Sequence, residues 1–177
     1  MSIGLKRGGV RLEPHDPAWD ESARHVIRIL RAILGPDALD VQHVGSTAIP
    51  AVPAKSIVDL AVLVRTPEDM RRHDAELSER GILFRKSQFD GQLLYIIGPC
   101  DARTHYIHVV VQGDPAWENY LCFRDYLNAC PDAARRYAEL KEDLFRRFPH
   151  DRERYTSGKH ALIRTLLGEA RSKRPES

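Results

Sequence analysis

Residues 43–64 read HVGSTAIPAVPAKSIVDLAVLV and contain the strand that decides the fold. The last eight residues of this stretch, 57–64, are apolar except for Asp59, a pattern typical of a strand inside a sheet. A buried carboxylate without a partner destabilises a fold, so we expect Asp59 at an edge or mouth of the sheet, where a ligand can reach it. Because side chains alternate between faces, Asp59, Ala61 and Leu63 share one face.

A turn of small residues precedes this strand. Gly45, Ser46 and Thr47 can present backbone N–H groups and hydroxyls to a phosphate without a bulky side chain in the way. Lys55 can supply the opposite charge, and Asp59 can hold a divalent cation, magnesium or manganese, that bridges phosphate oxygens. Together these residues predict a site for a nucleoside triphosphate, although its spacing is not that of a P-loop. Singly, they are also typical of an ordinary turn and a solvated lysine.

Two histidines are candidates for metal ligation or proton transfer. His43 lies two residues before Gly45, and we expect it to share the face of Gly45 and point at the same site. Neutral imidazoles ligate metals or accept protons, so the expected metal set is Asp59, His43 and His108. The alternative for each histidine is a hydrogen-bonded structural role, which we expect of His105, on the opposite face from His108.

The hydrophobic pattern predicts an α+β fold, a mixed β-sheet flanked by helices with a helical C-terminal part, in one domain over 1–177. Strands are expected at residues 10–12, 39–44, 56–64, 82–88, 92–97 and 105–112. Helices are expected at 17–34, 66–81, 115–148 with a break at Pro131, and 155–170. The pair Asp90-Gly91 signals a hairpin, which excludes a wholly parallel sheet. Loose ends are expected at about 1–9 and 171–177.

Composition narrows the class of protein. The 177 residues carry a formal net charge of +2, too small to predict a nucleic-acid partner. The longest apolar runs fall short of the roughly 20 residues that span a bilayer, and the first residues lack the apolar region of a signal peptide, so no membrane partner and a cytoplasmic location are expected. Cys100, Cys122 and Cys130 show no CxxC spacing, which predicts neither a disulfide framework nor a zinc site.

Five segments carry a resemblance that spans about residues 10–170. In chain order they are HDPAW (15–19), HVGSTAIPAVPAKSIVDLAV (43–62), THYIHVV (104–110), WENYLCFRDYLNACPDAARRYAELK (117–141) and RYTSGKHALI (154–163). The sequence resembles the GrpB family, a branch of the nucleotidyltransferase superfamily, in which these motifs occur in the same order.

The resemblance implies a nucleotidyltransferase-like fold and roles for matching residues. Gly45 and Ser46 match the turn that contacts nucleotide phosphates, and Asp59 matches the first carboxylate of the superfamily's magnesium-binding pair. The second carboxylate is replaced by Ala61, and GrpB relatives also tend to lack it. This departure weakens a two-metal mechanism, which relies on several anionic oxygens. His108 occupies the strand on which the superfamily has its third carboxylate.

Two more basic residues are candidates for phosphate binding. Arg124 either reaches the nucleotide or forms a structural pair with its neighbour Asp125. Lys159 either orients phosphate or stands in solvent at the start of a helix.

The sequence therefore leaves two functions open. In the first, the chain is a metal-dependent nucleotidyltransferase that passes a nucleotidyl group from a nucleoside triphosphate to a small-molecule acceptor, with Asp59, His108 and His43 as catalytic residues. In the second, the fold has lost turnover and serves as a nucleotide- or metabolite-binding or accessory module, which the alanine at position 61 favours.

Overall fold

The computed structural model describes residues 5–6, 11–86, 93–99 and 102–173. The helices are α1 (Pro17–Leu34), α2 (Pro67–Arg71), α3 (Asp74–Glu79), α4 (Pro115–Ala129), α5 (Pro131–Arg147), α6 (Arg152–Ser157) and α7 (His160–Ser172), with 3₁₀ turns η1 (Gly35–Asp37) and η2 (Ser46–Ala48). The strands are β1 (Leu5–Lys6), β2 (Ala38–Val44), β3 (Val58–Val64), β4 (Leu83–Lys86), β5 (Leu93–Ile97), β6 (Ala102–Arg103) and β7 (His105–Val111).

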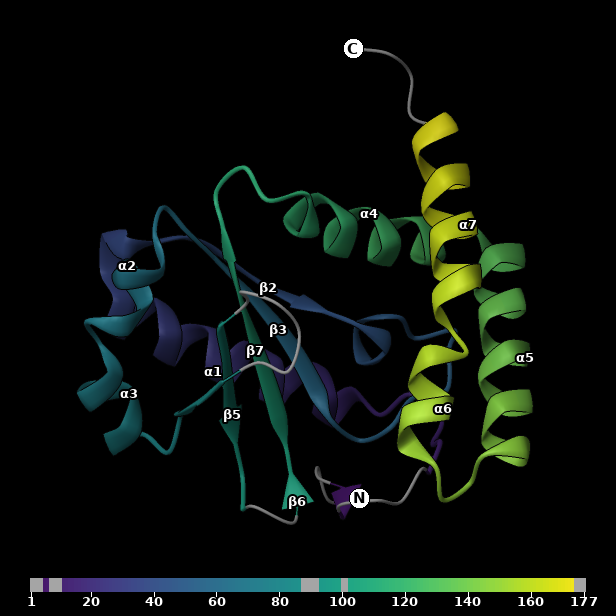
Figure 1. Cartoon of the computed structure of the whole chain (residues 1–177), viewed down its shortest axis with the longest axis horizontal. Coiled ribbons are helices and arrows are strands. Elements are labelled where there is room, and N and C mark those ends of the chain that lie inside the picture. The colour runs from purple at the N-terminus through teal and green to yellow at the C-terminus, as the bar shows by residue number, and fades with distance from the viewer. Residues whose placement is uncertain (1–4, 7–10, 87–92, 100–101, 174–177) are drawn as a thin grey trace.

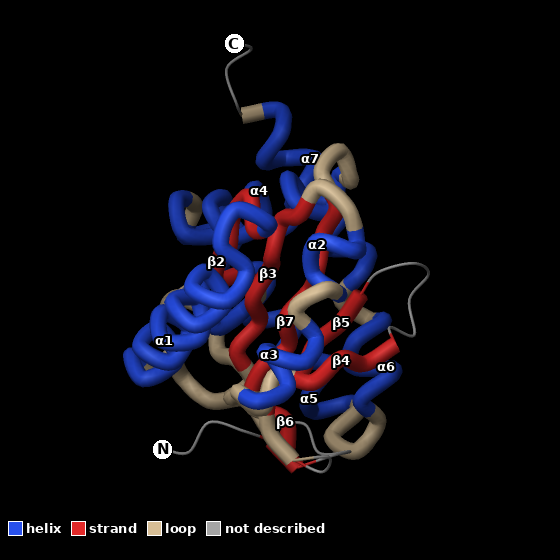
Figure 2. The backbone as a smooth tube through the Cα atoms, turned by 90° about the vertical axis from the view of Figure 1, so that its left-hand side faces the viewer, coloured by secondary structure: helices blue, strands red, loops and turns tan. Residues whose placement is uncertain are grey.

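Five of these strands form the central sheet, in the order β2-β3-β7-β5-β4 (Figure 2). The pair β3–β7 is parallel, and the other three pairs are antiparallel. The mixed sheet confirms the expected α+β class and excludes a doubly wound fold. The short strands β1 and β6 pair separately.

Helix α1 covers one face of the sheet and makes the main core. The Asp16 side chain caps it by accepting a 2.9 Å hydrogen bond from the Ala18 N–H, and Gly35, with φ +52°, ends it as expected. The apolar residues that α1 buries are Trp19, Ala23, Val26, Leu30 and Leu34. They join the alternate β3 residues Val58, Leu60, Val62 and Val64 in one cluster. Each fully buried aliphatic side chain contributes about 1.5–3 kcal/mol to this packing.

The C-terminal helices lie on the other face and at one side of the sheet (Figure 1). Helix α4 packs Trp117 against Val44, Ala61 and Val110, which belong to three neighbouring strands. As expected, Pro131 separates α4 from α5. Helices α5, α6 and α7 stand beside the sheet, on the side away from α2 and α3 (Figure 1). This arrangement leaves the beginning of β3, with Asp59, next to the helical part.

The expected helix over residues 66–81 is wrong in one respect, because it is divided into α2 and α3. The capping box of Thr66 and Asp69 starts it as expected. The chain then turns at Arg72 and His73, which both contact Asp37 of η1, at 3.6 and 2.9 Å. A distant contact thus interrupts a locally favoured helix.

The expected helix over residues 155–170 is also two helices, since α6 ends before Gly158 and α7 begins after Lys159. A Cβ atom added to Gly158 would lie 2.5 Å from Leu144 Cδ2, so α6 approaches α5 closely at this point. The close packing fixes the position of the break and of Lys159.

Smaller corrections concern the ends of elements. The strand expected at 10–12 is absent from the described residues 11–12, and a single bridge joins Glu13 to Ala54 instead. The strand expected from residue 56 begins at Val58. The end expected to be loose from residue 171 is helical to Ser172.

Some expectations lie at or outside the described residues. The turn at 90–91 and Cys100 fall outside them, but β4 and β5 pair antiparallel as the hairpin requires. Cys122 and Cys130 are free thiols. In the described ranges, no helix is long and apolar enough to cross a membrane.

The contact between Gly158 and Leu144 yields a test of the fold. Gly158→Ala is expected to lower the free energy of unfolding by about 1–3 kcal/mol, because the added methyl overpacks the α5–α6 contact. Gly168→Ala is the matched control: Gly168 is helical with nothing within 4 Å of an added Cβ, and its replacement should stabilise by about 0.5–1 kcal/mol. Denaturant unfolding of both variants checks this, and equal effects would contradict the packing.

Candidate functional site

Asp59 lies near the start of β3 on the sheet face that α4 covers. Its side chain is 32% exposed, and its Oδ1 lies 3.1 Å from Nε2 of His108, which is 26% exposed. Burial would raise the pKa of Asp59, but the hydrogen bond from His108 and the charges of His108, Lys55 and Lys159 outweigh it and lower the pKa. Asp59 is therefore an ionised carboxylate that solvent can reach, as the sequence predicts.

The small-residue turn meets this carboxylate directly. Val44, the last residue of β2, pairs with Asp59 across the sheet, so the turn begins beside the acid. Gly45 has φ +71°, and a Cβ on it would lie 2.8 Å from Asp59 Oδ2. Glycine is thus required twice at this position, by the backbone conformation and by the space.

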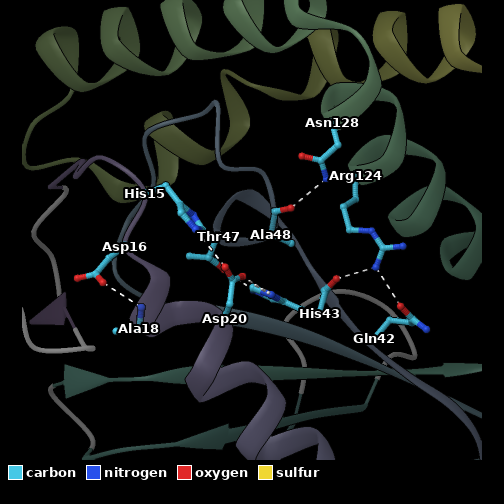
Figure 3. Close-up of polar contacts among 10 residues, drawn as sticks. All are labelled: His15, Asp16, Ala18, Asp20, Gln42, His43, Thr47, Ala48, Arg124 and Asn128. Carbon is cyan, nitrogen blue, oxygen red and sulfur yellow. Dashed lines mark hydrogen bonds and ion pairs between the residues drawn. The ribbon is translucent and has the colours of Figure 1, made fainter.

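His43 lies on the other face of the sheet, so the expectation that it points at the same site as Asp59 is wrong. It pairs with Leu60, whose side chain belongs to the α1 core. Its Nδ1 lies 3.5 Å from Asp20 Oδ1 of α1, and its Nε2 lies 2.9 Å from Thr47 Oγ1 (Figure 3). Strand alternation holds through Val44 and is lost at Gly45, where the strand has ended and the backbone has φ +71°, so His43 and Gly45 do not share a face.

His43 holds the turn at residues 45–48 in place through Thr47, from the sheet face that α1 covers. Burial lowers the pKa of His43 to about 4, against the opposing effect of Asp20, so the ring is neutral at pH 7. A neutral ring with Nδ1–H directed at Asp20 accepts at Nε2 the hydroxyl proton of Thr47. Thr47 is only 1% exposed, so its hydroxyl holds η2 and is not presented to a ligand. His15 extends the chain of contacts, with Nε2 3.1 Å from Asp20 Oδ2.

Arg124 ties α4 to β2. Its Nη1 donates to the backbone carbonyl of His43 at 2.9 Å and to Gln42 Oε1 at 3.0 Å (Figure 3). Its Nε donates to Asp125 Oδ1 at 2.7 Å. Asn128, one turn further along α4, donates to the Ala48 carbonyl. These contacts match the structural alternative for Arg124, and its contact with a cofactor stays a prediction.

The two lysines expected at the site both lie there. Lys55 Nζ is 5.3 Å and Lys159 Nζ is 4.8 Å from the centre of the Tyr155 ring, so both ammonium groups lie against one aromatic side chain. Burial and the charges of Arg152 and Lys159 lower the pKa of Lys55 to about 8. Burial also lowers the pKa of Lys159, against the charge of Asp59.

Sequence reasoning missed a third lysine. Lys141 of α5 is 2% exposed, donates to the Pro53 carbonyl and lies with Nζ 5.4 Å from the Tyr137 ring centre. A signal was present, because Lys141 occupies the buried stripe of α5, between Tyr137 and Leu144. A lysine at a core position of an amphipathic helix is uncommon and indicates a partner or a function.

Three further residues of the helical part surround the lysines. Tyr137 has a side-chain hydrogen bond with Ser46, and burial raises its pKa to about 12. Arg152 donates to the Tyr106 hydroxyl at 2.8 Å and thereby joins α6 to β7. The hydroxyl of Tyr155 is buried and has no hydrogen-bond partner in the described part of the chain. The spacing of Tyr137 predicts a core residue, and the structure adds a contact with Ser46 of the turn.

The side chains do not fit the metal that the fold family implies. Within the described ranges, no three His, Cys, Asp or Glu side chains gather where they could hold a metal ion. His43 faces away from Asp59, and buried Ala61 occupies the position of the second carboxylate. A divalent cation needs several oxygen ligands, and the nearby ammonium groups would repel it. The expected set of Asp59, His43 and His108 is therefore reduced to the pair Asp59–His108.

Two hollows of the surface lie elsewhere, over α1. One, of about 400 Å³, is lined by residues such as His25, Ile29 and Arg80, and the other, of about 520 Å³, by residues such as Glu21 and Arg28. Neither contains a residue of the candidate site.

Comparison with known proteins confirms the family resemblance. A family model described as GrpB protein matches residues 9–169. The chain belongs to the GrpB family. A UPF0157 protein of Pseudomonas aeruginosa is 36% identical over 165 residues, 91% of this chain and 67% of that protein. The glutamate-rich protein GrpB of Alkalihalophilus pseudofirmus is 32% identical, with 94% of this chain and 99% of that protein covered. The chain spans 46% of a Bacillus subtilis relative that is 33% identical.

Two solved structures show which known folds this chain resembles. GrpB of Enterococcus faecalis matches with a TM-score of 0.82 and 30% identity, over 92% of this chain and 98% of that one. The Cid1 poly(U) polymerase, solved with MgGTP bound, matches with a TM-score of 0.54 and 18% identity, over 77% of this chain and 45% of that one. At this identity the likeness shows the fold alone, and the fold is nucleotidyltransferase-like.

The neutral state of His43 predicts an acid-sensitive stability of this GrpB chain. Its folded pKa of about 4 lies below the ordinary 6.5, so its stabilising contribution is complete above pH 6.5 and is lost as the pH falls towards 4. The slope is at most about 1.4 kcal/mol per pH unit for this group.

Denaturant unfolding at several pH values between 7 and 4 measures this slope. His43→Gln should reduce it by the share of one histidine, because burial also lowers the pKa of His105 to about 4 and that contribution remains. His150→Gln, at an exposed position, should leave the slope unchanged. Identical slopes for the wild type and His43→Gln would contradict the assignment.

Proposed function

We propose that this GrpB-family protein binds a nucleotide through its phosphate groups, beside Asp59 and the turn that begins at Gly45. The observation that carries the proposal is the gathering of three lysines around a single carboxylate. Lys55, Lys141 and Lys159 come from three separate parts of the chain. The charge of Lys159 lowers the pKa of Lys55, and the charges of Lys55 and Lys159 lower the pKa of Lys141. Asp59 supplies the negative charge that opposes each of them.

The turn offers the second feature of a phosphate site. Ser46 is partly exposed and hydrogen-bonded to Tyr137, which directs its side chain towards the helical part. The backbone at Gly45 carries no side chain that would keep a phosphate away. The likeness to the Cid1 poly(U) polymerase, solved with MgGTP bound, makes a nucleotide the first phosphate compound to test.

Loss of Lys55 should weaken nucleotide binding. Lys55→Met removes one charged donor from the site, and the expected loss of affinity is about 10- to 100-fold. Calorimetric titration with each nucleoside triphosphate measures it. Lys173→Met is the matched control, because Lys173 is exposed at the end of α7 and should leave the affinity unchanged. Equal affinities of both variants would refute the assignment of Lys55.

Nucleotidyl transfer is the second candidate, favoured by the pair Asp59–His108 beside the turn. A carboxylate and an imidazole in contact can together take the proton of an acceptor hydroxyl. The acceptor oxygen would then bond to the α-phosphorus, and the bond from that phosphorus to the leaving pyrophosphate would break. The lysines would stabilise the negative charge of the pyrophosphate.

Release of pyrophosphate tests the second candidate. The wild type is incubated with each nucleoside triphosphate and a pool of small hydroxylated metabolites, with and without magnesium. Release is expected from the wild type and not from Asp59→Ala, which keeps the lysines but loses the carboxylate. Equal release by the two proteins, or none from either, would reject transfer while leaving nucleotide binding intact.

A further inference from the structure

The buried Lys141 and the half-buried Lys55 and Lys159 come from two parts of the fold. Lys55 precedes β3 and Lys159 separates α6 from α7, and both lie against the ring of Tyr155. Lys141 of α5 donates to the carbonyl of Pro53, two residues before Lys55 in the chain. The three lysines therefore lie where the loop before β3 meets the C-terminal helices.

The charges of this cluster do not balance. Burial lowers the pKa of each lysine, and the lysines and Arg152 lower it further for one another. Asp59 opposes them with a single negative charge and already accepts a hydrogen bond from His108. Buried cations that exceed their counter-charges destabilise a fold, so the arrangement favours an anion of more than one charge.

An unsatisfied hydroxyl lies in the same cluster. Tyr155 is fully buried, and its hydroxyl has no hydrogen-bond partner among the described residues, although both Lys55 and Lys159 lie against its ring. Leaving a buried hydroxyl unsatisfied destabilises a protein, and such groups are uncommon in native structures.

The same charges oppose a divalent cation. The fold family implies magnesium, yet this site offers one carboxylate, with a buried alanine at the position of the second. In metal-dependent phosphoryl transfer, the cation neutralises the phosphate oxygens. Ammonium groups fixed around the phosphates can do so without a cation.

We infer that Lys55, Lys141 and Lys159 take the place of the divalent metal, so that the site binds a metal-free polyphosphate chain. This inference rests on the proposed function and specifies the form of its ligand. Lys141 is the residue that distinguishes it, because Lys141 is buried in α5 and belongs to no described group of metal-binding side chains.

Calorimetric titration of the full chain with inorganic tripolyphosphate and with ATP tests this inference, once in EDTA and once in excess magnesium. We expect binding in EDTA and an affinity about ten-fold lower in magnesium, because the metal occupies the oxygens that the lysines bind. Binding that requires magnesium would overturn the inference and leave the proposed function standing. No binding in either buffer would remove both.

Two variants locate the site. Lys141→Met should lower the affinity for tripolyphosphate in EDTA at least about ten-fold and leave the Tm of the free protein equal or higher, since an unbalanced buried charge is replaced by an apolar side chain of similar length. Tyr155→Phe removes the unsatisfied hydroxyl but keeps the ring beside Lys55 and Lys159, so it should raise the Tm of the free protein and leave binding intact.

Lys173→Met serves as the control for a lost surface charge and should bind like the wild type. Unchanged affinity of Lys141→Met would overturn the inference whatever Tyr155→Phe does. A fall in affinity that is equal for Lys141→Met and Lys173→Met would also overturn it, because it would reflect net charge alone.

Discussion

The contact between Gly45 and Asp59 constrains the whole candidate site. The antiparallel register of β2 and β3 sets Val44 opposite Asp59, so β2 must end and turn where the carboxylate stands. Only a residue without a Cβ atom can make this turn at φ +71° within van der Waals distance of the carboxylate. The sheet thereby presents the Asp59 carboxylate and the backbone of Gly45, which has no side chain, side by side.

The helical part supplies what the sheet lacks. The sheet contributes one carboxylate and one imidazole to its exposed face, whereas most of the positive charge comes from the loop before β3 and from α5 to α7. Arg152 and Lys141 bond to groups of the sheet and the loop, so the two halves of the site are joined by the residues that define it. Burial of charge is thus coupled to the docking of the helices.

Local patterns in the sequence predict local structure well. The stripe of α1, the break at Pro131 and the strand around Asp59 follow from periodicity and from the chemistry of proline and glycine, and the structure has them. The family motifs also indicate the turn, the acid and two of the lysines. These features depend on residues that are neighbours in the chain.

Features set by distant contacts could not be predicted in this way. The face of His43 depends on the bend before Gly45 and on Asp20 of α1, and the turn between α2 and α3 depends on Asp37. Lys141 is an intermediate case, because its place on the apolar stripe of α5 is visible in the sequence. Its neighbours, which give the position its meaning, come from the loop before β3.

The unbalanced lysines have a consequence for laboratory evolution of this protein. A selection that rewards heat resistance alone would replace buried ammonium groups early, since an apolar side chain suits their surroundings better. The surviving clones would be more stable and would have lost the lysines to which we assign the proposed phosphate binding. Heat resistance and the proposed binding therefore place opposite demands on the same few positions. A library selected for heat resistance should keep these lysines fixed if binding is to be retained.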